Sequence, residues 1–95
     1  MVSPGFWALR PGAQDLAFRL FSVAEGQPIP ALPTFLAREL YNSSISHFTV
    51  AWRIGQLVKA GVIDWFDLEA ERFLFFPGTP VPEGAQLVRL RGFKN

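Results

Sequence analysis

The sequence predicts a single α+β domain that is mainly helical, with three helices followed by a β-hairpin. Three segments repeat apolar residues at helical spacing, and two later runs are rich in the aromatic and branched residues that favour strands. The 95 residues leave room for one domain, and 49% of them are hydrophobic, which is enough to supply a core. The sequence contains no cysteine, so no disulfide bond stabilises this core. We therefore expect residues 1–95 to fold as one unit.

The first predicted helix covers residues 13–25, ahead of a glycine suited to ending a helix. Apolar side chains recur along one of its faces: Leu16, Leu20 and Val23. Residues 27–31 are expected to be extended, because a proline keeps the residue before it out of the helical conformation. The helix and the extended piece together precede the rest of the fold.

Two further helices are expected, joined by a turn. The second starts near Pro33 and directs three residues inward: Leu36, Ala37 and Leu40. Asparagine and serine favour a turn over residues 41–44. The third helix has Ser46 as its N-cap and Gly61 as a left-handed residue at its C-terminal end. Its inner face carries Val50, Ile54, Leu57 and Val58.

The remainder of the chain favours β-structure. Residues 62–66 and 72–76 read as the two strands of a hairpin, separated by residues 67–71. Residues 85–91 alternate apolar and polar side chains, which indicates a further strand, with a short helix as the alternative.

Residues 37–63 resemble the second and third helices of winged helix-turn-helix transcriptional regulators from prokaryotes or their viruses. The matching segments are Ala37-Arg38-Glu39-Leu40, then Ser-x-x-Thr-Val, Arg-Ile-x-x-Leu and Ala-Gly-Val-Ile between Ser46 and Ile63. The resemblance implies a three-helix core with the helix-turn-helix over about residues 33–61, a wing over about residues 62–77 and a C-terminal strand or tail over residues 85–95. The turn departs from the pattern, because residues 41–45 make it longer than in the tightest family members.

The same resemblance implies a sequence-specific DNA-binding transcriptional regulator that places its third helix in the major groove of double-stranded DNA. A single recognition helix with few cations favours a homodimer on a two-fold site. The candidate DNA-binding residues are Ser46, His47, Thr49, Trp52, Arg53, Gln56, Lys59 and Arg72. Among them Gln56 suits adenine, whereas Arg53 and Lys59 suit phosphate.

Charge is distributed unevenly, although the formal net charge is only +1. Residues 40–63 contain no carboxylate. Acidic residues gather on or beside the predicted wing: Asp64, Asp67, Glu69 and Glu71. Three cations make the tail basic: Arg89, Arg91 and Lys94. Phosphate is therefore expected to meet the helix-turn-helix and the tail rather than the acidic wing.

Two aromatic side chains on the outer face of the third helix support an alternative function. Phe48 and Trp52 are spaced as neighbours on a helix, and exposed aromatic clusters mark interfaces. They would bury against the wing, a neighbouring subunit or another protein. The alternative is thus a winged-helix protein-protein interaction module. Further candidates for a dimer interface are the Phe6-Trp7 pair, the first helix and the C-terminal strand.

Other classes of function lack their signatures. The lone His47 cannot form a multi-histidine metal site, and no serine has the glycines of a nucleophile elbow. Phosphate-loop and dinucleotide motifs are absent from the sequence as well. We expect no enzyme, no cofactor and no metal. Without a signal or membrane segment, a cytoplasmic protein is expected, in the host cytoplasm if the source is viral.

Overall fold

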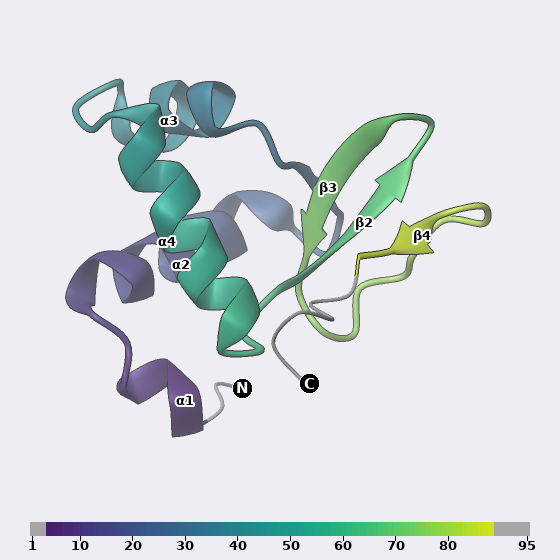
Figure 1. The fold of residues 1–95 in the computed structure, drawn as a ribbon, viewed down its shortest axis with the longest axis horizontal. Coiled ribbons are helices and arrows are strands. Elements are labelled where there is room, and N and C mark those ends of the chain that lie inside the picture. The colour runs from purple at the N-terminus through teal and green to yellow at the C-terminus, as the bar shows by residue number, and fades with distance from the viewer. Residues whose placement is uncertain (1–3, 89–95) are drawn as a thin grey trace.

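The computed structural model describes residues 4–88, which form four helices and a four-stranded antiparallel sheet (Figure 1). The elements in chain order are α1 (Pro4–Trp7), α2 (Pro11–Ala24), β1 (Ile29–Pro30), α3 (Pro33–Tyr41), α4 (His47–Lys59), β2 (Asp64–Leu68), β3 (Glu71–Phe75) and β4 (Gln86–Leu87). The predicted α+β class is confirmed. The basic residues predicted in the tail, Arg89, Arg91 and Lys94, lie outside the described residues.

Helix α2 begins at a proline, as many helices do, and therefore starts two residues earlier than predicted. Glu25 adopts a left-handed conformation (φ 50°) and Gly26 follows with φ 77°, which ends the helix as expected. The predicted inward position of Val23 is wrong, because its side chain is 52% exposed. The buried face follows Leu16, Leu20 and Ala24, and Val23 lies just off that row.

Helix α3 starts at Pro33 and buries the three residues predicted to face inward, together with Tyr41. Tyr41 belongs to the helix rather than to the turn. The turn begins at Asn42 and Ser43, which both have positive φ (54° and 63°). Asparagine is among the residues that tolerate this conformation best, so the connection terminates α3 directly after Tyr41.

The predicted caps of α4 are confirmed at both ends. The Ser46 hydroxyl accepts a hydrogen bond from the Thr49 amide (3.2 Å). At the other end, the Gly61 amide donates to the Val58 carbonyl and the Val62 amide to the Leu57 carbonyl, both at 3.0 Å. Gly61 has φ 78°, so these bonds form a Schellman motif.

The sheet has the strand order β1-β3-β2-β4. Strand β1, between α2 and α3, pairs with β3 through Ile29 opposite Leu74. The hairpin is confirmed, but its predicted five-residue connection is wrong. Glu69 and Ala70 alone connect β2 to β3, both with positive φ (52° and 69°). Such a two-residue turn matches the twist of paired strands. Each strand has the five residues predicted, but β2 lies two residues later and β3 one residue earlier than predicted.

The main core lies between the three longer helices and one face of the sheet (Figure 1). Its fully buried residues include Leu16, Leu20, Val50, Leu57 and Leu74. A second cluster joins Phe66 to Phe73 and Phe75, with ring centres 5.3 and 5.6 Å apart. Since successive strand residues alternate, this cluster occupies the sheet face opposite Leu74. The main core therefore holds the sheet against α4, and the second cluster holds β2 to β3.

No local pattern in the sequence predicts α1, a single turn that closes the core near the N-terminus. Phe6 is 1% exposed, and the side-chain amide of Gln14 donates to the carbonyls of Phe6 (3.1 Å) and Leu9 (3.0 Å). Phe6 is therefore a core residue, and its predicted availability for a dimer interface is wrong. Its neighbour Trp7 is exposed.

Candidate nucleic-acid interface

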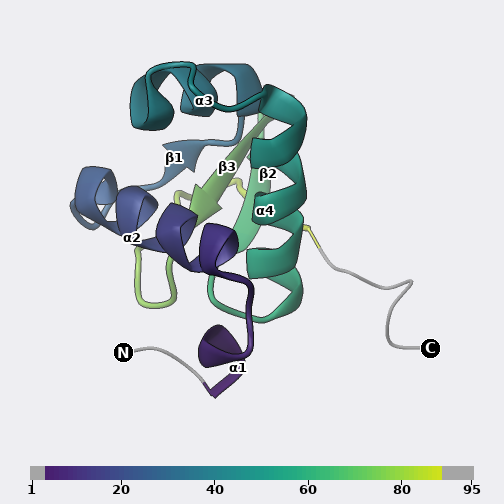
Figure 2. The ribbon, with the colours of Figure 1, turned by 90° about the vertical axis from the view of Figure 1, so that its left-hand side faces the viewer.

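Helix α4 is held on one side only. Its buried residues, Val50, Ile54, Leu57 and Val58, pack into the main core that α2 and α3 share. Figure 2 shows α4 running beside α2, with α3 above it and the hairpin strands behind. The opposite face of α4 is left uncovered by residues 4–88. This face carries most of the residues predicted to bind DNA.

The first turn of α4 presents three of these residues. Ser46 caps the helix, and its hydroxyl oxygen also lies 3.1 Å from the Thr49 hydroxyl oxygen. His47 is exposed, and its ring centre lies 4.2 Å from that of Phe48. Ser46 and Thr49 are thus hydrogen-bonded to each other, and their hydroxyl groups lie at the surface. The structure brings Ser46, His47 and Thr49 together at the start of α4.

Two large aromatic rings dominate the N-terminal half of the outer face of α4. Phe48 is 75% exposed and Trp52 is 67% exposed. The prediction that both point outward is confirmed, and the option that they bury against the hairpin is wrong. An open groove of about 530 Å³ adjoins Trp52. Its lining is Leu9, Ala51, Trp52, Gly55, Gln56, Lys59 and Ala60.

Gln56 and Lys59 lie further along the same face. Gln56 is partly exposed and lines the groove, so its amide is available beside a mostly apolar surface. Lys59 is exposed at the last residue of α4. A cation in this position also interacts favourably with the negative end of the helix dipole.

Arg53 lies at the edge of the face and has contacts within the protein. Its Nη1 lies 3.4 Å from the Tyr41 hydroxyl, and its guanidinium carbon lies 5.7 Å from the centre of the Tyr41 ring. The first turn of α2 also approaches closely, because a Cβ added to Gly12 would lie 2.7 Å from the Arg53 guanidinium carbon. These contacts hold the positive charge beside the start of α2.

Arg72 is the predicted residue that does not lie on α4 or its cap. It is on β3, where its guanidinium forms two hydrogen bonds to Asp67 (2.8 and 3.1 Å). The guanidinium also covers the ring of Trp65, 4.8 Å from the ring centre. The hydrogen bond from Arg72 lowers the pKa of Asp67. Asp67 therefore stays ionised near neutral pH and offsets the charge of Arg72.

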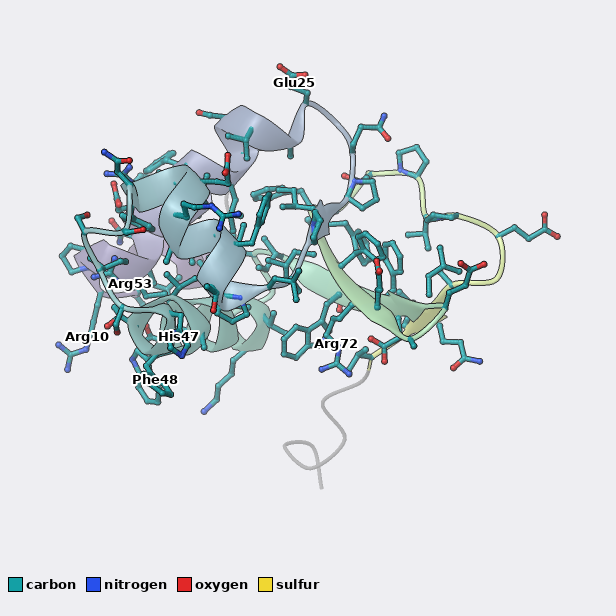
Figure 3. All side chains as sticks on the ribbon, turned by 90° about the horizontal axis from the view of Figure 1, so that it is seen from above. Arg10, Glu25, His47, Phe48, Arg53 and Arg72 are labelled. Carbon is teal, nitrogen blue, oxygen red and sulfur yellow. The ribbon has the colours of Figure 1, made fainter. Side chains whose placement is uncertain are left out.

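Sequence reasoning missed Arg10. This residue precedes α2, is exposed, and comes two residues before the glycine on which Arg53 packs. In Figure 3, Arg10, His47, Phe48 and Arg72 extend toward one edge of the molecule, whereas Glu25 projects from the opposite edge. The position of Arg10 depends on the packing of α2 against α4, for which the local sequence carries no signal.

Cationic groups therefore border the aromatic face on the α2 side and at the C-terminal end of α4. Arg10 and Arg53 flank α4 on the α2 side, Lys59 lies at its C-terminal end, and no residue from 40 to 63 is acidic. Within residues 4–88, no three side chains of histidine, aspartate or glutamate lie close enough together to hold a metal ion. This part of the surface thus combines exposed aromatic rings with nearby cations.

No helix within the described part of the chain is both long and apolar enough to cross a membrane. Comparison with protein-family models, with curated protein sequences and with solved structures finds no match for this chain.

Proposed function

We propose that this chain is a sequence-specific DNA-binding transcriptional regulator of the winged helix-turn-helix type. The observation that carries the proposal is the uncovered outer face of α4, which lacks carboxylates and is flanked by Arg10, Arg53 and Lys59. A helix of this width fits the major groove of B-form DNA. Phosphates on either side of the groove would then lie near the flanking cations.

The arrangement of the other elements supports this proposal. The order helix, strand, helix, helix, hairpin is the one that the resemblance of residues 37–63 implies, and β1 joins the hairpin sheet through β3. In this arrangement α2 and α3 hold α4 from behind. The hairpin would act as the wing, although Asp67 and Glu69 would keep its tip away from phosphate.

A homodimer on a two-fold DNA site is part of the proposal, since one recognition helix supplies few phosphate contacts. Exposed aromatic residues on the first two helices offer a surface for it. Trp7 is 65% exposed, and Phe18 is 57% exposed. Both rings contact the buried Phe6 edge to face, with ring centres 5.0 and 5.5 Å apart. They would be held rigidly enough to serve as anchors.

The test is binding to a labelled DNA duplex of random sequence, about two helical turns long, followed by fluorescence anisotropy. We expect binding at micromolar protein in about 50 mM salt, weakening steeply toward about 200 mM. Replacing Arg10 or Lys59 with glutamine should weaken binding, and the logarithmic salt slope should become shallower by about 0.9 for each phosphate that the variant no longer neutralises.

Gln27→Glu is the matched control, because it also lowers the net charge by one. It is two residues along the chain from Glu25, which projects from the edge opposite His47 and Phe48 of α4. Equal weakening by the control would mean that only the net charge matters. An absence of binding at about 50 mM salt would contradict the proposal itself.

The exposure of Phe48 and Trp52 favours a second candidate, a protein-protein interaction module. In that case the two rings would be anchors for a protein partner. Duplex binding would be absent or insensitive to Arg10 and Lys59. The DNA-binding experiment therefore discriminates between the two functions.

A further inference from the structure

The outer face of α4 is apolar at its centre. From Phe48 to Gly55 its exposed residues are two aromatic rings, one methyl group and one glycine: Phe48, Ala51, Trp52 and Gly55. The groove beside Trp52 has a mostly apolar lining, with Gln56 and Lys59 as its polar members. A helix that contacted only phosphates and polar base edges would not need this apolar surface.

Because Gly55 has no side chain, the groove extends to the backbone of α4 at this position. Gly55 lies in the middle of the helix, and a Cβ built on it would have no atom within 4 Å. Glycine in an exposed helix interior is less stable than alanine, and no packing contact within residues 4–88 explains it. A small apolar group of a partner could therefore approach the main chain of α4 beside the Trp52 ring.

The charges around the face select an anionic partner. No carboxylate occurs from residue 40 to residue 63, and Arg10, Arg53 and Lys59 lie at the margins. The occupant must thus combine negative charge at its edges with apolar groups at its centre. In the major groove of DNA, the phosphates lie at the edges, and the apolar group on the base edges is the 5-methyl group of thymine.

We infer that α4 selects A·T base pairs by burying thymine 5-methyl groups against Trp52 and Phe48. Gly55 leaves room for a methyl group at the helix backbone, and the Gln56 amide pairs with the N6 and N7 atoms of adenine. The inference rests on the proposed DNA binding and adds the chemical group that the helix recognises.

The test compares four duplexes of equal length and charge in about 50 mM salt. One is A·T-rich, the second has deoxyuridine in place of thymidine, the third is G·C-rich, and the fourth is G·C-rich with 5-methylcytosine. Deoxyuridine removes only the major-groove methyl group. We expect the removal of each buried methyl group to weaken binding about threefold to fourfold. The 5-methylcytosine duplex should bind more tightly than its unmethylated form.

Variants assign the effect to α4. The double variant Trp52→Ala, Phe48→Ala should bind the thymidine and deoxyuridine duplexes nearly equally while keeping its salt dependence. Val23→Ala is the matched control, because it removes an apolar side chain that is exposed on α2 and lies outside the groove. This variant should discriminate as the unaltered protein does.

The outcomes separate the inference from the proposed function. Salt-dependent binding with equal affinity for the thymidine and deoxyuridine duplexes would overturn the inference and leave DNA binding standing. Discrimination that survives in the double variant Trp52→Ala, Phe48→Ala would also overturn it. Failure to bind any of the four duplexes would overturn both.

Discussion

The Nη1 atom of Arg53 lies 3.4 Å from the hydroxyl oxygen of Tyr41, so the last residue of α3 contacts the middle of α4. Arg19 of α2 also covers the Tyr41 ring, 4.3 Å from its centre. Tyr41 therefore links the three longer helices. Burial raises the pKa of Tyr41, and the hydrogen bond from Arg53 partly opposes this shift.

Replacing Tyr41 with phenylalanine should make the protein less sensitive to alkaline pH. Below the unfolded pKa of about 10.0, the tyrosine is neutral in both states. As the pH rises further, the unfolded chain loses the proton first, so stability falls until the folded pKa is passed. Tyr41→Phe removes this loss, at the cost of about 1 kcal/mol for the hydrogen bond at neutral pH. Urea unfolding at pH values on both sides of 10.0 measures the difference. Equal alkaline slopes in the two proteins would contradict the assignment.

Alanine should have opposite effects at two glycines of α4 and its cap. Gly55→Ala should stabilise by about 0.5–1 kcal/mol, because alanine is the better helix former. Gly61→Ala should destabilise by about 1 kcal/mol, because φ is 78° there and alanine disfavours this region. A Cβ at either position would meet no atom within 4 Å, so changes in packing do not contribute to the stability difference between the two variants. Thermal unfolding should show the midpoint moving by about 4–8 °C per kcal/mol. Shifts of the same sign would refute the explanation.

Substitutions in the turn between β2 and β3 should stabilise the protein. Glu69 and Ala70 hold positive φ (52° and 69°), which costs residues other than glycine and asparagine about 1 kcal/mol or more each. Asparagine-glycine is the favoured pair for such a turn, so the double substitution Glu69→Asn, Ala70→Gly should raise the free energy of unfolding by about 1 kcal/mol. Glu69→Gln removes the same charge without easing the backbone and is the control. An equal gain from the control would point to charge rather than to backbone strain.

Local sequence patterns were sufficient to predict α4. The Ser46 hydroxyl caps the start of the helix, and Gly61 adopts the positive φ that ends it. Both effects act on residues close by in the chain, so both ends of the helix could be predicted from the sequence. The hairpin connection was mispredicted for a related reason. Glu69 and Ala70 are not residues that usually adopt positive φ, and the turn is imposed by the pairing of β2 with β3. Tertiary pairing overrode the local preference.

The contacts between elements could not be predicted from spacing. The approach of Gly12 to Arg53 and the contact of Arg53 with Tyr41 depend on how α2 and α3 pack on α4. The same packing positions Arg10, which sequence reasoning missed. The outward direction of Phe48 and Trp52, in contrast, follows from the helical period alone once Val50 and Ile54 are placed inside.

The ion pair on the hairpin provides the last prediction, which concerns the proposed DNA binding. Arg72 donates two hydrogen bonds to Asp67, and this interaction lowers the pKa of Asp67. At neutral pH the carboxylate is therefore charged, competes with phosphate for Arg72 and repels the DNA backbone. Asp67→Asn should tighten duplex binding and steepen the logarithmic salt slope by about 0.9 if Arg72 then binds one phosphate.

Glu25→Gln is the matched control for Asp67→Asn, since both remove one negative charge and Glu25 projects from the side opposite Phe48 and Arg72. Anisotropy titrations over a range of salt concentrations should show a steeper slope for Asp67→Asn only. If both variants tighten binding equally, the gain comes from net charge, and the hairpin does not approach DNA. If the double variant Asp67→Asn, Arg72→Ala keeps the gain, repulsion by Asp67 rather than the release of Arg72 is responsible. Loss of the gain in the double variant would assign it to Arg72 and bring the hairpin to the phosphate backbone.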